Sequence, residues 1–248
     1  MLLAALRKSV RLFPPAIIKR CEVYGTGEYF DETLNREAVF SDMLQRLTDE
    51  ALREAFLIEF RNLDNSLSGY KVFRENRYFA VNWLRVRNSL HNVEQVESRF
   101  SSSRIRQIKK GLNNGAEVKE AHTPEEIHAY AKMLHYNYSA KIRRHFPSID
   151  FFQLLEQQMP RKSRIFIVTY KDKVIGGSVC IYSNDSAYLW FSGGMRKTYA
   201  LQYPGILAVW QALRDAKERV YRHLEVMDVG RPVHHQGYRD IVHRIGGN

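Results

Sequence analysis

The chain has 248 residues, of which 44% are hydrophobic and 12% aromatic, so it can bury a substantial core and is not a disordered tail. Its net charge of +11 favours an anionic partner such as a cofactor phosphate, a tRNA backbone or lipid headgroups, although a charged surface without a dedicated site would give the same excess. No apolar run is long enough for a membrane span, and MLLAALRKSVRLF is too short for a signal peptide.

The two cysteines, Cys21 and Cys180, lie far apart in the sequence. They provide neither a disulfide framework nor the ligand spacing of a zinc site. We therefore expect no metal, a reducing cytoplasmic environment, and two thiols that act as small buried hydrophobic groups.

The first 33 residues predict an irregular lead-in, because Pro14 and Pro15 stop any early helix. Within it, CEVYGTGEYF predicts a strand followed by a glycine turn. The two glycines of that turn fit a simple turn or a phosphate loop, since a GxG pattern alone is weakly specific.

The segment LNREAVFSDMLQRLTDEALR is amphipathic and predicts a helix. Two strands are expected after it, one in AFLIEFRNL and one in YFAVNWLRVRNSL, where apolar residues alternate. Glycine and polar residues separate these elements.

Residues 98–115, SRFSSSRIRQIKKGLNNG, predict a basic helix that Ser102 or Ser103 caps and Gly115 ends. Its apolar side is expected to be Ile105, Ile108 and Leu112. Four cations remain for solvent, namely Arg104, Arg106, Lys109 and Lys110. Arg106, Lys109 and Lys110 share part of one face, which either binds phosphates of a substrate or is simply solvated.

Two more helices are expected over 123–138 and 147–159, the first with a capping box from Thr123 to Glu126. The connection NYSAKIRRHFPSID combines Lys141, Arg143 and Arg144 with aromatic residues. It fits either a nucleic-acid contact by charge and stacking or a mobile lid.

The rest of the chain is arranged around the stretch from Arg164 to Arg231, and a function can be inferred from this part of the sequence. RIFIVTYK, VIGGSVCIYS and SAYLWFSGG predict three strands joined by short polar turns, which is typical of antiparallel hairpins. PGILAVWQALRDAKERV then predicts a helix that begins at Pro204, and HLEVMDVG predicts a further strand. Such a helix must cross over to a neighbouring strand of the same sheet.

These stretches resemble the GNAT acyltransferase superfamily, and more closely its branch of Fem-type peptidyl- and aminoacyltransferases. RIRQIKKGLNNGAEVKEA resembles the basic helix of that branch, KVIGGSVCIYSNDSAYLWFSGG its glycine-pair hairpin, and LEVMDVG its strand ending in aspartate and glycine. IVHRIGGN resembles its final strand, with Ile245 where phenylalanine is usual. The resemblance covers roughly residues 55–248.

The resemblance implies an α+β fold with a GNAT-like, mixed but mostly antiparallel twisted sheet flanked by helices. It also implies two lobes: an incomplete N-terminal GNAT-like lobe over 1–97 and a C-terminal acyltransferase domain over 98–248, which either stand apart or pack as one unit. The hairpin strands that usually open the first lobe are expected to be missing here, so residues 21–90 resemble only its second half, and the lobe is either truncated or a structural buttress.

The resemblance places the acyl donor where two parallel strands separate and the next helix points its amino terminus at pyrophosphate, as suits a helix N-terminus. The corresponding loop here is MRKTYALQYPG, which lacks the glycine-rich signature of coenzyme A users. The expected cofactor-binding residues are Arg196, Lys197, Tyr199, Tyr203 and Gly205. The expected substrate-binding residues are Tyr188 and Trp190 with Arg106, Lys109 and Lys110 of the basic helix.

Asp228 and His234 are the catalytic candidates, because a carboxylate or neutral imidazole there can accept a proton from an attacking amine. Hydrogen bonding of Asp228 to a nearby turn is the structural alternative. The sequence thus predicts an N-acyltransferase that uses acyl-CoA or aminoacyl-tRNA as a phosphate-bearing donor and an amine as acceptor. A Fem-type peptidyltransferase that binds tRNA and a non-catalytic binding module on a decayed transferase are the alternatives.

Overall fold

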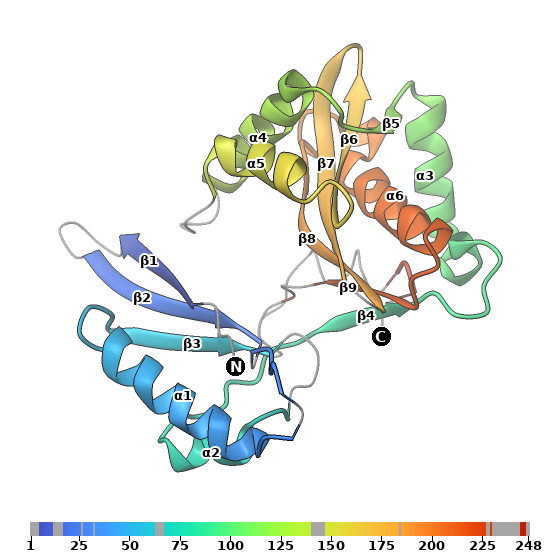
Figure 1. The fold of residues 1–248 in the computed structure, drawn as a ribbon. Helices are drawn as coiled ribbons and strands as arrows, with labels where there is room; N and C mark the ends of the chain where they lie inside the picture. The colour runs from blue at the N-terminus through green and yellow to red at the C-terminus, as the bar shows by residue number, and fades with distance from the viewer. Residues whose placement is uncertain are drawn as a thin grey trace. The chain divides into compact units, whose positions relative to one another are not determined.

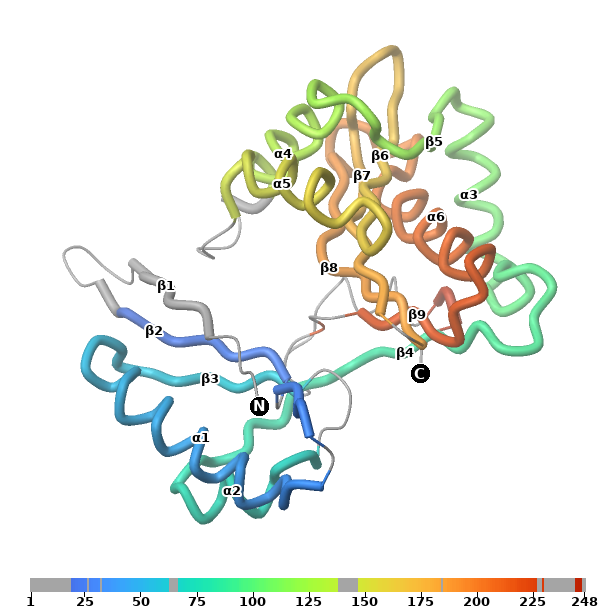
Figure 2. Tube along the Cα trace, in the orientation of Figure 1, coloured from blue at the N-terminus to red at the C-terminus, as the bar shows by residue number. Residues whose placement is uncertain are grey.

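The computed structural model describes residues 5–11, 17–25, 27–31, 33–62, 67–139, 147–183, 185–226, 229 and 244–246 (Figures 1 and 2). The chain forms two compact units, Met1–Val81 and Asn82–Asn248.

The N-terminal unit contains a three-stranded sheet of order β1-β2-β3 and two helices. The strands are β1 (Ala5–Arg11), β2 (Ile17–Tyr24) and β3 (Leu57–Arg61), and the helices are α1 (Arg36–Ala51) and α2 (Tyr70–Glu75). β1 and β2 are antiparallel, whereas β2 and β3 are parallel and are connected through α1.

The prediction of an irregular lead-in over residues 1–33 is therefore wrong, since β1 pairs with β2 along the whole length of β1. The reason is visible in ALRKSVR, where the cations Arg7, Lys8 and Arg11 hide any apolar alternation. This strand is defined by its backbone hydrogen bonds to β2, and such bonds cannot be recognised from the order of apolar and polar side chains in the sequence.

One face of this sheet is apolar and lies against the helices. Cys21 and Val23 pack with Ala51 and Ala55, and Phe40 and Leu44 of α1 pack with Val72 of α2. Asn35 begins α1, because its side-chain oxygen accepts hydrogen bonds from the amides of Glu37 at 3.1 Å and Ala38 at 3.2 Å.

The opposite face of β2 and β3 carries charged side chains at every second position, as strand geometry requires. Arg20 forms an ion pair with the buried Glu22, and Arg61 Nε lies 2.6 Å from Glu59 Oε1. Burial and the neighbouring Glu22 carboxylate raise the pKa of Tyr24 to about 12, so its hydroxyl stays protonated and donates to Glu22.

The C-terminal unit contains a six-stranded sheet of order β4-β9-β8-β7-β6-β5 (Figure 1). Its strands are β4 (Val86–Ser89), β5 (Glu117–Glu120), β6 (Ser163–Tyr170), β7 (Lys173–Tyr182), β8 (Ser186–Gly194) and β9 (His223–Val226). Only β8 and β9 are parallel; the other neighbours in the described sheet are antiparallel. The predicted hairpins, and the predicted parallel pairing of the strand near 224 with the strand near 186, are thus confirmed.

The helices of this unit are α3 (Ser102–Asn113), α4 (Pro124–Ser139), α5 (Ile149–Gln158) and α6 (Pro204–Glu218), with short 3₁₀ turns η1 (Val96–Arg99) and η2 (Ala200–Gln202). Figure 1 shows α4 and α5 on one side of the sheet and α3 and α6 on the other. The α+β architecture with a mostly antiparallel sheet flanked by helices is confirmed.

The residues of the long strands divide between these two layers by the period-2 rule. Phe166 and Val168 of β6 pack with α6, whereas Ile165 and Ile167 pack with α4 and α5. A strand buried on both faces reads as a continuous apolar run, which is why RIFIVTYK predicts a central strand correctly.

β4 is shorter than the strand predicted within YFAVNWLRVRNSL, and it belongs to the C-terminal sheet, where it pairs with β9 from Val86 to Ser89. β4 lies in the second compact unit, which begins at Asn82, and the lobe boundary expected at residue 97 stays a prediction. The pairing partner is more than 130 positions away in the chain, so local patterning cannot indicate it.

Candidate functional site

The amino terminus of α6 lies against the ends of β7 and β8, and glycines make that approach possible. A β-carbon on Gly194 would lie 2.5 Å from the Gly205 nitrogen, and one on Gly176 would lie 2.8 Å from Pro204 Cβ. Because real side chains do not come this close, only glycine fits at these two strand positions. The helix start is therefore held directly on the sheet.

The loop between β8 and α6 is a compact turn. The Met195 amide donates to the Ile175 carbonyl at 2.8 Å, which ends the ladder between β7 and β8. The Met195 carbonyl then accepts from the amides of Thr198 at 3.2 Å and Tyr199 at 2.9 Å. Arg196 and Lys197 are exposed at the tip of this turn, and neither forms an ion pair with a described residue.

Tyr199 and Tyr203 have a packing role in this loop. The Tyr199 ring meets the Tyr170 ring edge to face at 6.0 Å, and both tyrosines pack against the core beneath α6. Tyr203 caps the helix in the left-handed region with a φ of 48°. A bulky residue adopts that conformation only where its surroundings hold it, and such strain often accompanies a binding site.

A β-bulge lies in β8 beside the parallel pair. Leu189 and Phe191 face the adjacent residues Cys180 and Val179 of β7, which leaves Trp190 as the extra residue. The bulge turns both Trp190 and Phe191 toward α5, where their rings stack at 5.1 Å and Phe151 contacts Trp190 at 5.5 Å. Trp190 is thus partly buried and packs against the core on the side of α4 and α5.

Tyr188, the other residue predicted in β8, lies opposite Glu225 in the parallel register. Glu225 is only 2% exposed, and it pairs with Arg85 Nε at 2.5 Å and with Arg87 Nη2 at 2.8 Å. Two guanidinium groups compensate this buried carboxylate. The sequence interpretation missed Glu225, although a glutamate inside the apolar run HLEVMDVG is a detectable signal.

The basic helix α3 packs through Gly111, where a β-carbon would lie 2.6 Å from the Gln202 carbonyl oxygen. Asn114 Nδ2 also donates to the Leu201 carbonyl at 3.0 Å, so α3 supports the segment that leads into α6. Arg106, Lys109 and Lys110 are exposed, as predicted, and Gly115 ends the helix with a φ of 81°. These three cations lie on α3 and not in the turn that carries Arg196.

Two details of the α3 prediction are wrong. Leu112 is 37% exposed although it is expected on the buried side, and Arg104 is 5% exposed although it is expected in solvent. The N-cap is Ser101 instead of Ser102 or Ser103. The buried residues of α3 are Arg104, Ile108 and Gly111, which are spaced by four and three positions and therefore lie on one face of the helix.

The catalytic candidates Asp228 and His234 lie outside the described residues, as does the basic connection with Lys141, Arg143 and Arg144. Val229, next to Asp228, is described and fully buried in the core beside α6. The roles of Asp228 and His234 stay predictions.

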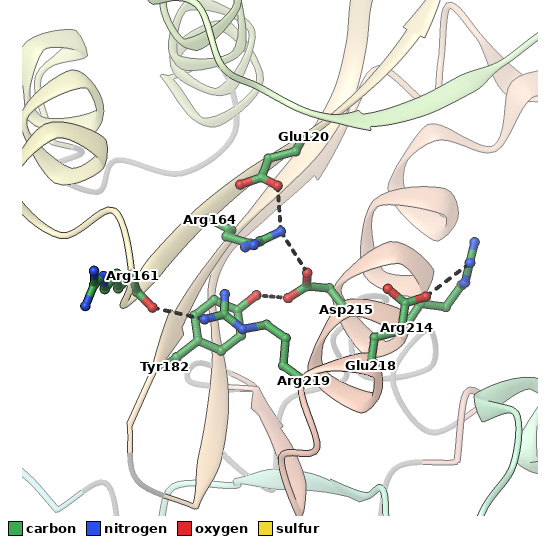
Figure 3. A network of polar contacts seen from close by, with 8 residues as sticks. All are labelled: Glu120, Arg161, Arg164, Tyr182, Arg214, Asp215, Glu218 and Arg219. Carbon is green, nitrogen blue, oxygen red and sulfur yellow. Dashed lines mark hydrogen bonds and ion pairs between the residues drawn. The ribbon is translucent and has the colours of Figure 1, made fainter.

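A buried polar network lies at the opposite end of α6 (Figure 3). The Tyr182 hydroxyl donates to Asp215, and Arg164 Nη1 lies 3.3 Å from Asp215 Oδ1 and 2.6 Å from Glu120 Oε2. Burial, and then the neighbouring Cys180 and Asp215, raise the pKa of Tyr182, so the phenol stays a donor. Asp215 is eleven residues from Pro204, roughly 16 Å along the helix, so this network braces the fold and is remote from the helix start.

The expectation that both cysteines are buried is confirmed. Burial raises the pKa of the Cys180 thiol, which makes it unsuited to act as a nucleophile. Within the described ranges, no three His, Cys, Asp or Glu side chains are grouped so that they could hold a metal ion. None of the helices described here has the length and apolar character that crossing a membrane requires.

Comparison with solved structures finds similar folds at low sequence identity. FemX superposes with a TM-score of 0.64 at 10% identity, covering 99% of this chain and 85% of FemX. L-PGS from Bacillus licheniformis gives 0.55 at 11% identity, covering 96% and 71%. A GCN5-related N-acetyltransferase from Kribbella flavida gives 0.52 at 13% identity, covering 98% and 85%.

A comparison with curated protein sequences finds no match. The family model of the acetyltransferase (GNAT) domain, in contrast, matches residues 102–240, which is more than half of the chain and includes α3, the α6 start and the β8–β9 pair. The chain therefore belongs to the GNAT acetyltransferase family and has a Fem-like fold.

Proposed function

We propose that this protein is an N-acyltransferase that moves an acyl or aminoacyl group from a phosphate-bearing donor to an amine. The observation that carries the proposal is the fixed start of α6. Gly194 and Gly176 hold the helix N-terminus on the sheet beside the parallel strands β8 and β9. A helix N-terminus is suited to bind phosphate, and the exposed cations Arg196 and Lys197 stand in the loop that precedes it.

In the proposed reaction, the amine nitrogen attacks the donor carbonyl, and the tetrahedral oxyanion accepts a hydrogen bond from a backbone amide of the sheet. Asp228 or His234 takes the proton that the amine loses. The bond to the leaving group then breaks, releasing coenzyme A as its thiolate, or the tRNA ribose oxygen, which takes the proton back from the same residue and leaves as a hydroxyl. Such a transfer requires positioning and deprotonation but no covalent intermediate on the protein.

Aminoacyl-tRNA is the second candidate donor, because the loop MRKTYALQYPG has only Gly205 where coenzyme A users carry several glycines. The net charge of +11 and the Fem-like fold support this alternative. A Fem-type peptidyltransferase with the N-terminal unit as an incomplete lobe would follow from it.

The test is a paired assay with acetyl-CoA and charged tRNA as donors and a panel of amines as acceptors, with product mass as the readout. Transfer from either donor that depends on Asp228 supports the proposal and identifies the donor. If neither donor binds or raises the melting temperature, the protein is a non-catalytic binding module and the proposal is wrong.

A further inference from the structure

Arg104 is a buried arginine without a counter-ion in the described part of the chain. It lies in the first turn of α3 and is only 5% exposed. Its Nη1 donates to the neutral Gln107 side chain at 2.8 Å, and its Nε is buried without any hydrogen-bond partner. A buried guanidinium that lacks a carboxylate is costly, and a missing anion is one explanation for it.

The surroundings of Arg104 are also positive. The C-terminal turn 244–246 is fixed to the start of α3, because the Ser101 amide donates to the Arg244 carbonyl at 3.1 Å. Burial, followed by the positive charges of Arg244 and Arg196, lowers the pKa of Arg104. The first turn of α3 adds amide dipoles of the same sign, and Ser101 does not cap it through its side chain.

We infer that Arg104, together with Arg244 beside the amino terminus of α3, forms a site for a phosphate group, to which Arg196 of the β8–α6 loop adds a third positive charge. Arg104 would supply the buried guanidinium that fixes the anion, and the two outer arginines would close around its remaining oxygens. Guanidinium groups suit phosphate because their N–H groups match its oxygens in pairs. This inference deepens the proposed function, since Arg196 belongs to the loop proposed to bind the donor.

The buried charge of Arg104 affects the stability of the free protein. An unpaired buried cation destabilises the free protein, so replacing it with an apolar side chain of similar length should not reduce stability and can increase it. The Arg104→Met variant is therefore expected to melt at the same temperature as the parent protein or higher. A purely structural arginine, in contrast, would lower the melting temperature when it is lost.

The experiment measures melting temperature against increasing inorganic phosphate, with sodium chloride at matched ionic strength to remove the effect of screening. The parent protein should be stabilised by phosphate beyond chloride, because a ligand that binds only the folded state raises its stability. Arg104→Met and Arg196→Gln should each weaken the apparent phosphate affinity at least about tenfold. Arg161→Gln, which changes an exposed arginine on a distant turn, is the matched control and should leave it unchanged.

Titrations with coenzyme A and with uncharged tRNA then show which donor carries this phosphate. The affinity of that donor for Arg104→Met should fall by about the same factor as the affinity for inorganic phosphate. Equal phosphate stabilisation in all variants, or none beyond chloride in the parent protein, would overturn the inference. Acyl transfer that persists in Arg104→Met with unchanged donor affinity would refute this site and leave the proposed function intact.

Discussion

The Gly194 α-carbon and the Gly205 amide are packed so closely that a β-carbon on Gly194 would lie 2.5 Å from the Gly205 nitrogen. Gly205 itself has open space at its β-carbon position, with no atom within 4 Å. Packing therefore requires glycine at position 194 but not at position 205. Substituting the two glycines one at a time can separate effects on stability from effects on donor binding at the α6 start.

Gly194→Ala should destabilise the protein by about 1–3 kcal/mol, because the added methyl group pushes α6 away from the sheet. Gly205→Ala should keep or slightly raise the melting temperature, since alanine is the better helix former. If the donor approaches the helix start closely, Gly205→Ala will nevertheless weaken donor binding. Equal melting temperatures for parent and Gly194→Ala in thermal denaturation would contradict the packing account.

The three exposed cations of α3 are tested by salt dependence. If Arg106, Lys109 and Lys110 contact a polyanion, changing all three to glutamine should weaken tRNA binding and flatten the dependence of its affinity on salt. The measurement is a salt titration of the dissociation constant for the parent and triple variant. An unchanged slope assigns these charges to solvation.

Tyr182→Phe should destabilise the fold by about 1–3 kcal/mol, because Asp215 loses a buried hydrogen-bond donor. Donor affinity should stay unchanged, since this network lies at the other end of α6 from Pro204. Urea denaturation and donor titration of the same variant check both halves. Reduced donor affinity with unaltered stability would show that the network belongs to the site.

Glu126 gives the fold a measurable acid dependence. The pKa of Glu126 is lowered from 4.5 to about 2. The main cause is the hydrogen bond from the Lys119 ammonium group, and the hydrogen bond from the His122 amide also contributes. A depressed folded-state pKa adds stability above pH 4.5 that disappears as the pH falls toward 2. The difference in unfolding free energy between the parent and Glu126→Gln should therefore be largest above pH 4.5 and shrink below it.

Glu125→Gln is the control for this titration, because Glu125 is exposed on the same helical turn and forms no ion pair with Lys119. A difference between parent and Glu126→Gln that stays constant from pH 6 to about 2 would contradict the linkage.

Much of the fold could be predicted because local patterns and the final structure agree. The α4 capping box forms as expected, with the Glu126 amide 3.2 Å from Thr123 Oγ1, and α6 begins at Pro204. The strand β1 and the chain position of β4 could not be predicted, since both are defined by backbone pairing with distant strands.

The charged residues show where sequence reasoning fails for the site. Arg104 and Glu225 are both expected in solvent by residue type, yet they are 5% and 2% exposed. The burial of a charge depends on its tertiary partners, such as Arg85 and Arg87 around Glu225, and these come from a separate strand region. Arg196 and Lys197 could be placed from sequence because they precede a helix that was itself predictable.

Isothermal titration of acetyl-CoA and of aminoacyl-tRNA into the parent protein and Arg196→Ala tests the central claim most directly. Loss of one charge-assisted phosphate contact costs on the order of 1.5–3 kcal/mol, so the dissociation constant of the true donor should rise roughly tenfold or more. Asp228→Asn should bind that donor nearly as well as the parent and transfer its acyl group more slowly. If Arg196→Ala binds every donor as tightly as the parent protein, the α6 start is not the donor site.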